Sequence, residues 1–137
     1  MNKRPMITVT VEIYAPMENI WKNWNTPKDI QKWNNINNDW HTPVVENDCR
    51  AGGKFLYRMG TKDGSLHFDF TGQYDIVTEH ELIAYTLDSG RTATITFSQG
   101  YPVIITETFE PGEEPSIEEQ RNFCQAILNS FKNYVEQ

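Results

Sequence analysis

Residues 116–135, Ser-Ile-Glu-Glu-Gln-Arg-Asn-Phe-Cys-Gln-Ala-Ile-Leu-Asn-Ser-Phe-Lys-Asn-Tyr-Val, decide the fold that this sequence predicts. Apolar residues recur here at three- and four-residue spacing, which is typical of an amphipathic helix with one buried face. Ser116 followed by Glu119 is a capping box, so the helix should begin directly after Ser116. Because no other predicted helix is as long, this one is expected to cover a sheet.

Most of the remaining chain has the two-residue period of β-strands. Residues 7–13 alternate Ile and Val with Thr and Glu, which predicts a strand with one buried face. After Pro43 the chain is expected to become a run of strands that is first interrupted at Gly52-Gly53 and continues at about 54–59, 66–74, 82–87, 92–98 and 103–109. Short turn segments rich in Gly, Asp and Ser separate them, and this arrangement is typical of an antiparallel meander.

Two short helices are expected between the first strand and the meander. Met17, Ile20 and Trp24 fall along one helical face, and Pro16 suits the first helical position. Thr26 suits the N-cap of a second helix that runs to about Trp33. The sequence therefore predicts an α+β fold in which about six or seven antiparallel strands face one long C-terminal helix.

Composition restricts the possible partners. The chain has 137 residues without an internal linker, so we expect a single domain over residues 1–137. Twelve basic and nineteen acidic residues give a net charge of -7, which repels nucleic acid and anionic lipid headgroups. No apolar stretch approaches the about 18 residues of a membrane span, and no signal-peptide layout is present. A cytoplasmic protein without stable membrane insertion is expected.

No motif by itself indicates a metal, a cofactor or a reaction. The three histidines lack the spacing of zinc motifs, and Cys49 and Cys124 are predicted to be free thiols. Gly52-Gly53 leads into a strand instead of a helix, so a phosphate loop is not expected. The sequence also lacks the Gly-x-Ser-x-Gly nucleophile motif. We therefore expect no metal and no cofactor, and the catalytic residues, if any, stay unknown.

A sheet that curls around a long helix leaves a space between the two, and this space is the candidate ligand site. Aromatic and aliphatic side chains from the expected inward faces form its predicted lining. The candidate residues are Trp33, Trp40, Phe55, Tyr57, Phe68, Phe70, Tyr74, Tyr85, Phe97, Glu107, Phe123, Ile127 and Phe131.

Glu107 is the exception to the apolar pattern, because Val103, Ile105 and Phe109 share its face. A carboxylate on a buried face needs a partner, a water molecule or a ligand. If Ala93 lies opposite Glu107 in the last hairpin, its small side chain leaves room for a ligand's polar group. The alternative is a bulge or a rim position that returns Glu107 to solvent.

Several short motifs occur in an order that is similar to a known superfamily. They are Ala15-Pro16-Met17-Glu18-Asn19-Ile20-Trp21, Ile30-Gln31-Lys32-Trp33, Asp39-Trp40-His41, Gly52-Gly53-Lys54-Phe55, Tyr57-Arg58-Met59, Lys62-Asp63-Gly64, Phe68-Asp69-Phe70, Thr106-Glu107-Thr108-Phe109 and Gln125-Ala126-Ile127-Leu128. With them the chain resembles the START-like or SRPBCC superfamily, which has the helix-grip fold of the birch-pollen allergen. Within it the chain is most similar to bacterial homologues of the activator of heat-shock protein 90 ATPase.

This resemblance implies a cavity but leaves three functions open, because the superfamily uses one scaffold for many roles. The leading hypothesis is binding of a small hydrophobic or amphipathic molecule, lipid-like ones included. The second is an enzyme resembling polyketide cyclases, in which Glu107 and a tyrosine act as acid and base groups. The third is a protein-interaction module that regulates a chaperone ATPase. It ranks last because the activators of that kind carry a further N-terminal domain.

Overall fold

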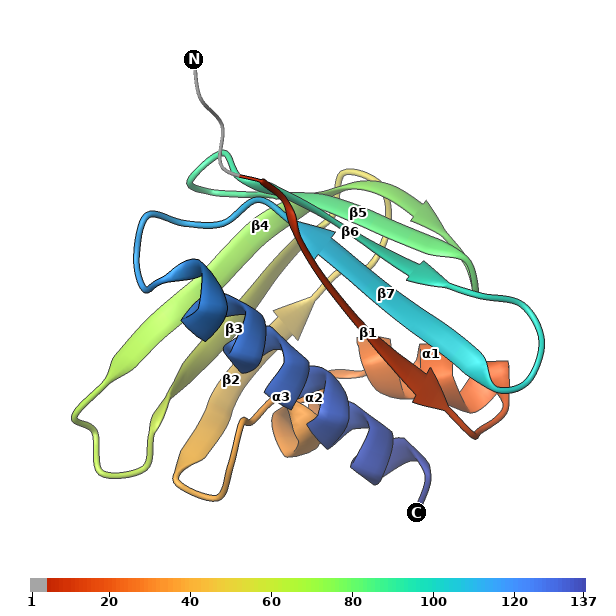
Figure 1. Cartoon of the computed structure of the whole chain (residues 1–137), viewed down its shortest axis with the longest axis horizontal. Coiled ribbons are helices and arrows are strands. Elements are labelled where there is room, and N and C mark those ends of the chain that lie inside the picture. Colours follow the sequence, from red (N-terminus) through yellow and green to blue (C-terminus); the bar gives the residue numbers. More distant parts are fainter. Residues whose placement is uncertain (1–4) are drawn as a thin grey trace.

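A computed structural model describes residues 5–137, which form seven strands and three helices (Figure 1). Residues 1–4 of the predicted domain lie outside the described residues. The strands are β1 (Ile7–Ile13), β2 (Trp40–Asn47), β3 (Lys54–Thr61), β4 (His67–Thr78), β5 (Leu82–Leu87), β6 (Thr92–Phe97) and β7 (Val103–Phe109). The helices are α1 (Met17–Asn25), α2 (Pro27–Trp33) and α3 (Ile117–Val135).

The strands form one antiparallel sheet in the order β1-β7-β6-β5-β4-β3-β2. Each strand from β2 to β6 pairs with the next in the chain, and β1 pairs with β7. The sheet curls around α3, which crosses its concave side (Figure 1). The predicted α+β helix-grip arrangement, with two short helices after the first strand, is therefore confirmed.

The run of strands was predicted to start after Pro43, but the edge strand β2 already begins at Trp40. Pro43 lies within it, and proline is tolerated in a sheet only where its missing N–H faces an unpaired edge or a bulge. Both conditions hold, because β2 is the outermost strand and its pairing with β3 shifts register between His41 and Val44. Pro16 also differs from prediction, since it is the N-cap of α1 instead of its first residue.

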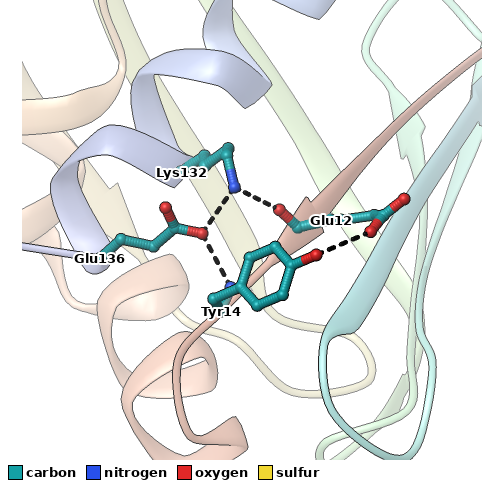
Figure 2. A network of polar contacts seen from close by, with 4 residues as sticks. All are labelled: Glu12, Tyr14, Lys132 and Glu136. Atoms are coloured by element: carbon teal, nitrogen blue, oxygen red, sulfur yellow. Dashed lines mark hydrogen bonds and ion pairs between the residues drawn. The ribbon is translucent and has the colours of Figure 1, made fainter.

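Helix α3 begins where the sequence predicted. The Ser116 side chain accepts a hydrogen bond from the Glu119 backbone N–H, with a distance of 3.1 Å from nitrogen to oxygen. At the other end of α3, Figure 2 shows Lys132 donating to the Glu12 backbone oxygen at 2.8 Å and to Glu136 at 2.7 Å. Glu136 also accepts from the Tyr14 N–H at 2.8 Å. These contacts fasten α3 to the end of β1.

The core beneath the C-terminal half of α3 is closely packed. Phe131 and Leu128 are fully buried, and the Phe131 ring centre lies 4.9 Å from those of Trp24 and Trp33. These tryptophans come from α1 and α2, which close this end of the curved sheet (Figure 1). Hydrophobic burial and edge-to-face ring contacts therefore stabilise the end of the molecule where the C-terminal half of α3 lies.

Candidate functional site

A cavity of about 740 Å³ lies between the concave face of the sheet and the N-terminal half of α3. Its volume falls within the about 300–1,000 Å³ of small-molecule sites. Most side chains proposed from the sequence as its lining do line it. They are Trp33, Trp40, Phe55, Tyr57, Phe68, Phe70, Tyr74, Tyr85, Glu107, Phe123 and Ile127.

Phe97 and Phe131, the two remaining candidates, lie outside this lining. The Phe97 ring packs edge-to-face against Trp21 at 5.2 Å and Trp24 at 5.7 Å between ring centres. Phe131 packs against Trp24 and Trp33. Both phenylalanines face inward, as predicted, but they lie where α1 and α2 supply aromatic side chains that fill the space.

The cavity has further lining residues that the sequence analysis did not propose. Met59, Ile83 and Ile95 come from the inward faces of the strands, and the strand parity that selected the aromatic candidates also selects them. A further set of polar lining residues forms the mouth of the cavity and had no comparable signal in the sequence. These residues come from the β5–β6 turn, the β7–α3 connection and the start of α3, which meet only in the folded chain. They include Arg91, Glu110, Glu114, Glu119 and Gln120.

The mouth of the cavity has one clamped side and one apolar side. Gln120 of α3 exchanges two hydrogen bonds of 2.9 Å with the backbone of Gly112, which holds the β7–α3 connection against the helix. Leu66 and Phe68 line the cavity but are 52% and 39% exposed. Their strand face was predicted to meet the core. At this end of the β3–β4 hairpin it forms a partly exposed rim of the cavity instead, where Phe68 contacts Phe123 of α3 with 6.5 Å between ring centres.

Glu107 lies on the concave face and lines the cavity, as its strand parity predicted. The carboxyl is half-buried, and since it lies in the cavity wall its accessible part faces the cavity interior. Its Oε2 accepts a hydrogen bond from the Cys124 thiol at 3.3 Å. Burial raises the pKa of Glu107 to about 7, and the weak Cys124 donor offsets only part of that rise. At neutral pH much of this carboxyl therefore carries its proton.

The residue opposite Glu107 is Ile95, and the prediction of Ala93 was wrong. Ala93 lies opposite Phe109, so it is a diagonal neighbour of Glu107 on the same face. The register follows from the hairpin connection, where the Ser98 N–H bonds the Ile104 oxygen at 2.9 Å. This closure makes the loop two residues longer than the predicted pairing requires, and the loop length fixes the register of a hairpin.

Three tyrosines of the cavity wall bring hydroxyl groups to the same region. Tyr74 donates to the Oδ1 atom of Asn47, and its hydroxyl also interacts with Tyr57 and Cys49. The Tyr85 hydroxyl forms no hydrogen bond with any residue between 5 and 137. Burial raises the pKa of all three phenols above the ordinary value of 10, so they are neutral hydrogen-bonding groups.

The two cysteines are free thiols, as predicted. Burial raises the pKa of Cys49 to about 11, and burial together with the Glu107 carboxylate raises that of Cys124 still further. Neither thiol is therefore activated as a nucleophile. Within residues 5–137, no group of three His, Cys, Asp or Glu side chains is placed to hold a metal ion. None of the described helices is long and apolar enough to cross a membrane.

Comparison with known proteins identifies the class and then the family. The curled antiparallel sheet, the long C-terminal helix and the two helices after β1 define a START-like protein of the helix-grip class. Residues 14–136 match the family described as Activator of Hsp90 ATPase homolog 1-like protein. The chain belongs to this family. None of the curated proteins compared with the chain matches it.

Solved structures agree with this assignment. An AHSA1-like protein from Aeromonas hydrophila is 34% identical, with a TM-score of 0.88 over 96% of this chain and 92% of that one. A protein from Cytophaga hutchinsonii is 46% identical, with a TM-score of 0.81 over 95% of this chain and 91% of that one. A Chromobacterium violaceum protein shares the fold at 21% identity, with a TM-score of 0.87 over 98% and 99% of the two chains.

Proposed function

We propose that this protein binds a small hydrophobic or amphipathic molecule in the cavity between the sheet and α3. The observation that carries the proposal is a cavity of about 740 Å³ with a largely aromatic and aliphatic lining. Atoms that line an empty space lose the van der Waals contacts that close packing provides. A ligand of matching shape restores those contacts and removes its own apolar surface from water.

The aromatic wall favours a flat or elongated apolar body. Phe55 lies at the centre of this wall, with ring centres 5.4 Å from Phe70 and 5.1 Å from Tyr85. The charged side chains of the lining, apart from Glu107, are Arg91, Glu110, Glu114 and Glu119. They come from the β5–β6 turn, the end of β7, the connection to α3 and the first turn of that helix. The body of the ligand would therefore contact neutral side chains, while a polar end would reach the mouth.

Titration with fatty acids, flavonoids and polycyclic hydrocarbons tests this proposal. Trp33 and Trp40 line the cavity, so tryptophan fluorescence should report binding directly. Binding to the native state should also raise the melting temperature by mass action. Native mass spectrometry of protein purified from its source would identify a ligand that is retained during purification.

A filled-cavity variant provides the control. Ile127→Trp places a large ring in the cavity and should abolish binding, whereas Asn122→Trp, at an exposed position of the same helix, should leave it unchanged. The proposal fails if the whole panel changes neither fluorescence nor melting temperature of the wild-type protein. It also fails if Ile127→Trp binds as well as the wild type.

A second candidate function is regulation of a chaperone ATPase, which the description of the family suggests. The specific observation is an exposed apolar patch formed by Tyr14, Tyr101 and Ile104, which are 51%, 68% and 42% exposed. The two tyrosine rings contact each other edge-to-face at 5.8 Å. Adding the protein to a purified Hsp90-type ATPase tests this function, and Tyr101→Ser should remove any stimulation that depends on the patch.

A further inference from the structure

We infer that the ligand carries a neutral carbonyl oxygen on an aromatic body, and that Glu107 and Tyr85 both donate hydrogen bonds to that oxygen inside the cavity. This inference rests on the proposed function and specifies its ligand class. It follows from the position of two polar side chains on a concave face that is otherwise largely apolar, and from hydrogen-bonding capacity that the protein leaves unused.

The sheet brings the two groups to opposite sides of β6. Tyr85 on β5 pairs with Ala93, while Glu107 on β7 pairs with Ile95, two residues further along the same strand. Neighbouring strands lie about 4.8 Å apart, so the β5 and β7 backbones are separated by about 10 Å. All four side chains face the cavity. Because Ala93 extends no further than its methyl group, it leaves space between the phenol and the carboxyl.

Both polar groups have hydrogen-bonding capacity that no described residue uses. The Tyr85 hydroxyl has no partner among residues 5–137. The one hydrogen bond given to Glu107 comes from the Cys124 thiol, which is a weak donor. Because both residues line the cavity, this remaining capacity is accessible to water or to a ligand.

The surroundings of Glu107 favour its neutral form. The groups that face it are Cys124 from α3, Tyr57 from β3 and Tyr85 from β5, and its strand neighbours on β1 and β6 are Val9 and Ile95. None of these carries a positive charge. Burial therefore raises the carboxyl pKa to about 7 without a compensating cation.

Two neutral donors match a carbonyl oxygen. A protonated carboxyl and a phenol each present one O–H, and a carbonyl oxygen has two lone pairs to accept them. A carboxylate at this position would instead bring a second acid beside Glu107, at a high desolvation cost, because the lining cation Arg91 belongs to the mouth and is not among the groups that face Glu107. The aromatic rings of Phe55, Phe70 and Tyr57 around this region suit a flat ring system that bears the carbonyl.

The experiment compares 9-fluorenone with fluorene, which have the same ring system but differ in a carbonyl in place of a methylene group. Binding is measured by tryptophan fluorescence at pH 5.5 and pH 8.5. At pH 5.5 the wild type should bind fluorenone about tenfold more tightly, as two net hydrogen bonds predict. At pH 8.5 Glu107 is ionised and can only accept, so the preference should fall by about fivefold.

Variants assign the preference to the two residues. Glu107→Gln retains an N–H donor and should keep a preference for fluorenone that no longer depends on pH. Glu107→Leu and Tyr85→Phe should each lower the preference by about threefold or more, while fluorene binding persists. Glu81→Gln, which removes an exposed acid that does not line the cavity, is the control and should behave like the wild type.

The outcomes separate the two proposals. If fluorene and fluorenone bind the wild type equally at both pH values, the carbonyl inference is wrong, while cavity binding stands. If neither compound binds and the wider panel is also inert, both proposals are wrong. The comparison of the two ligands uses the wild-type protein, so the result holds even for a variant that does not fold.

Discussion

The two halves of α3 face different interiors. On the C-terminal half, Leu128 and Phe131 are completely buried against side chains of α1, α2 and the sheet. On the N-terminal half, Phe123, Cys124 and Ile127 belong to the same apolar stripe but are only half-buried, because they line a cavity. One continuous helix with one apolar face therefore covers both a closely packed core and an open cavity.

The difference shows that the partner of a helix face decides whether the space beneath it is filled. Trp24 and Trp33 lie stacked with their ring centres 5.0 Å apart, and they fill the gap between sheet and helix near Phe131. Near Phe123 the helix faces only the curved sheet. Side chains from two surfaces that diverge cannot restore close packing across the widening gap.

The largest expected effect is on the closely packed half. Phe131→Ala removes a fully buried ring and should lower the free energy of unfolding by about 3–5 kcal/mol. Phe123→Ala, on the cavity half, should cost about 1 kcal/mol, because its ring is partly exposed and leaves no new enclosed void. Chemical denaturation of both variants measures the difference. Equal losses would contradict the distinction between the two halves.

A smaller effect is expected at the carboxyl group of the open half. The folded pKa of Glu107 is about 7 against an ordinary value of 4.5, so the folded protein holds this proton more tightly than the unfolded chain. Stability should therefore fall as pH rises from about 4.5 to 7, and the loss persists above pH 7, with an upper limit of about 3 kcal/mol.

The glutamine side chain of the Glu107→Gln variant does not titrate, so this variant should not lose stability as the pH rises. At pH 8 the variant should be more stable than the wild type by up to about 3 kcal/mol, and at pH 4.5 the difference should disappear. Urea denaturation at the two pH values measures it, with Glu114→Gln as the control for the loss of one negative charge. A variant that is less stable than the wild type at pH 8 would mean that Glu107 is held as a carboxylate.

The smallest effect concerns the space itself. Ala15 and Ala93 are both buried, at 5% and 4% exposure, but only Ala93 lines the cavity. Ala15→Leu should overpack the core and cost about 1–3 kcal/mol. Ala93→Leu should change stability by less than about 1 kcal/mol, because its added atoms enter open space, and it should weaken fluorenone binding. Thermal and chemical denaturation of the pair would show whether the cavity persists in solution.

Some features could be predicted because they depend on local periodicity. The start of α3 after Ser116 follows from a capping box, and the inward direction of Glu107 follows from the alternation of side chains along β7. The start of β2 was placed after Pro43 for a related reason. Its local signal includes Pro43, which argues against a strand until its position at the edge of the sheet is known.

By itself, the sequence determined the order and type of most elements, the apolar faces that they bury and the acid that lies among them. Tertiary structure alone decided that Ile95 lies opposite Glu107, that Phe131 joins a filled core, and that Arg91 and Gln120 meet at the mouth of the cavity. The physical reason is that periodicity fixes the direction of a side chain relative to its own backbone. Register, closure of the sheet around the helix and the volume left unfilled depend on contacts between residues far apart in the chain.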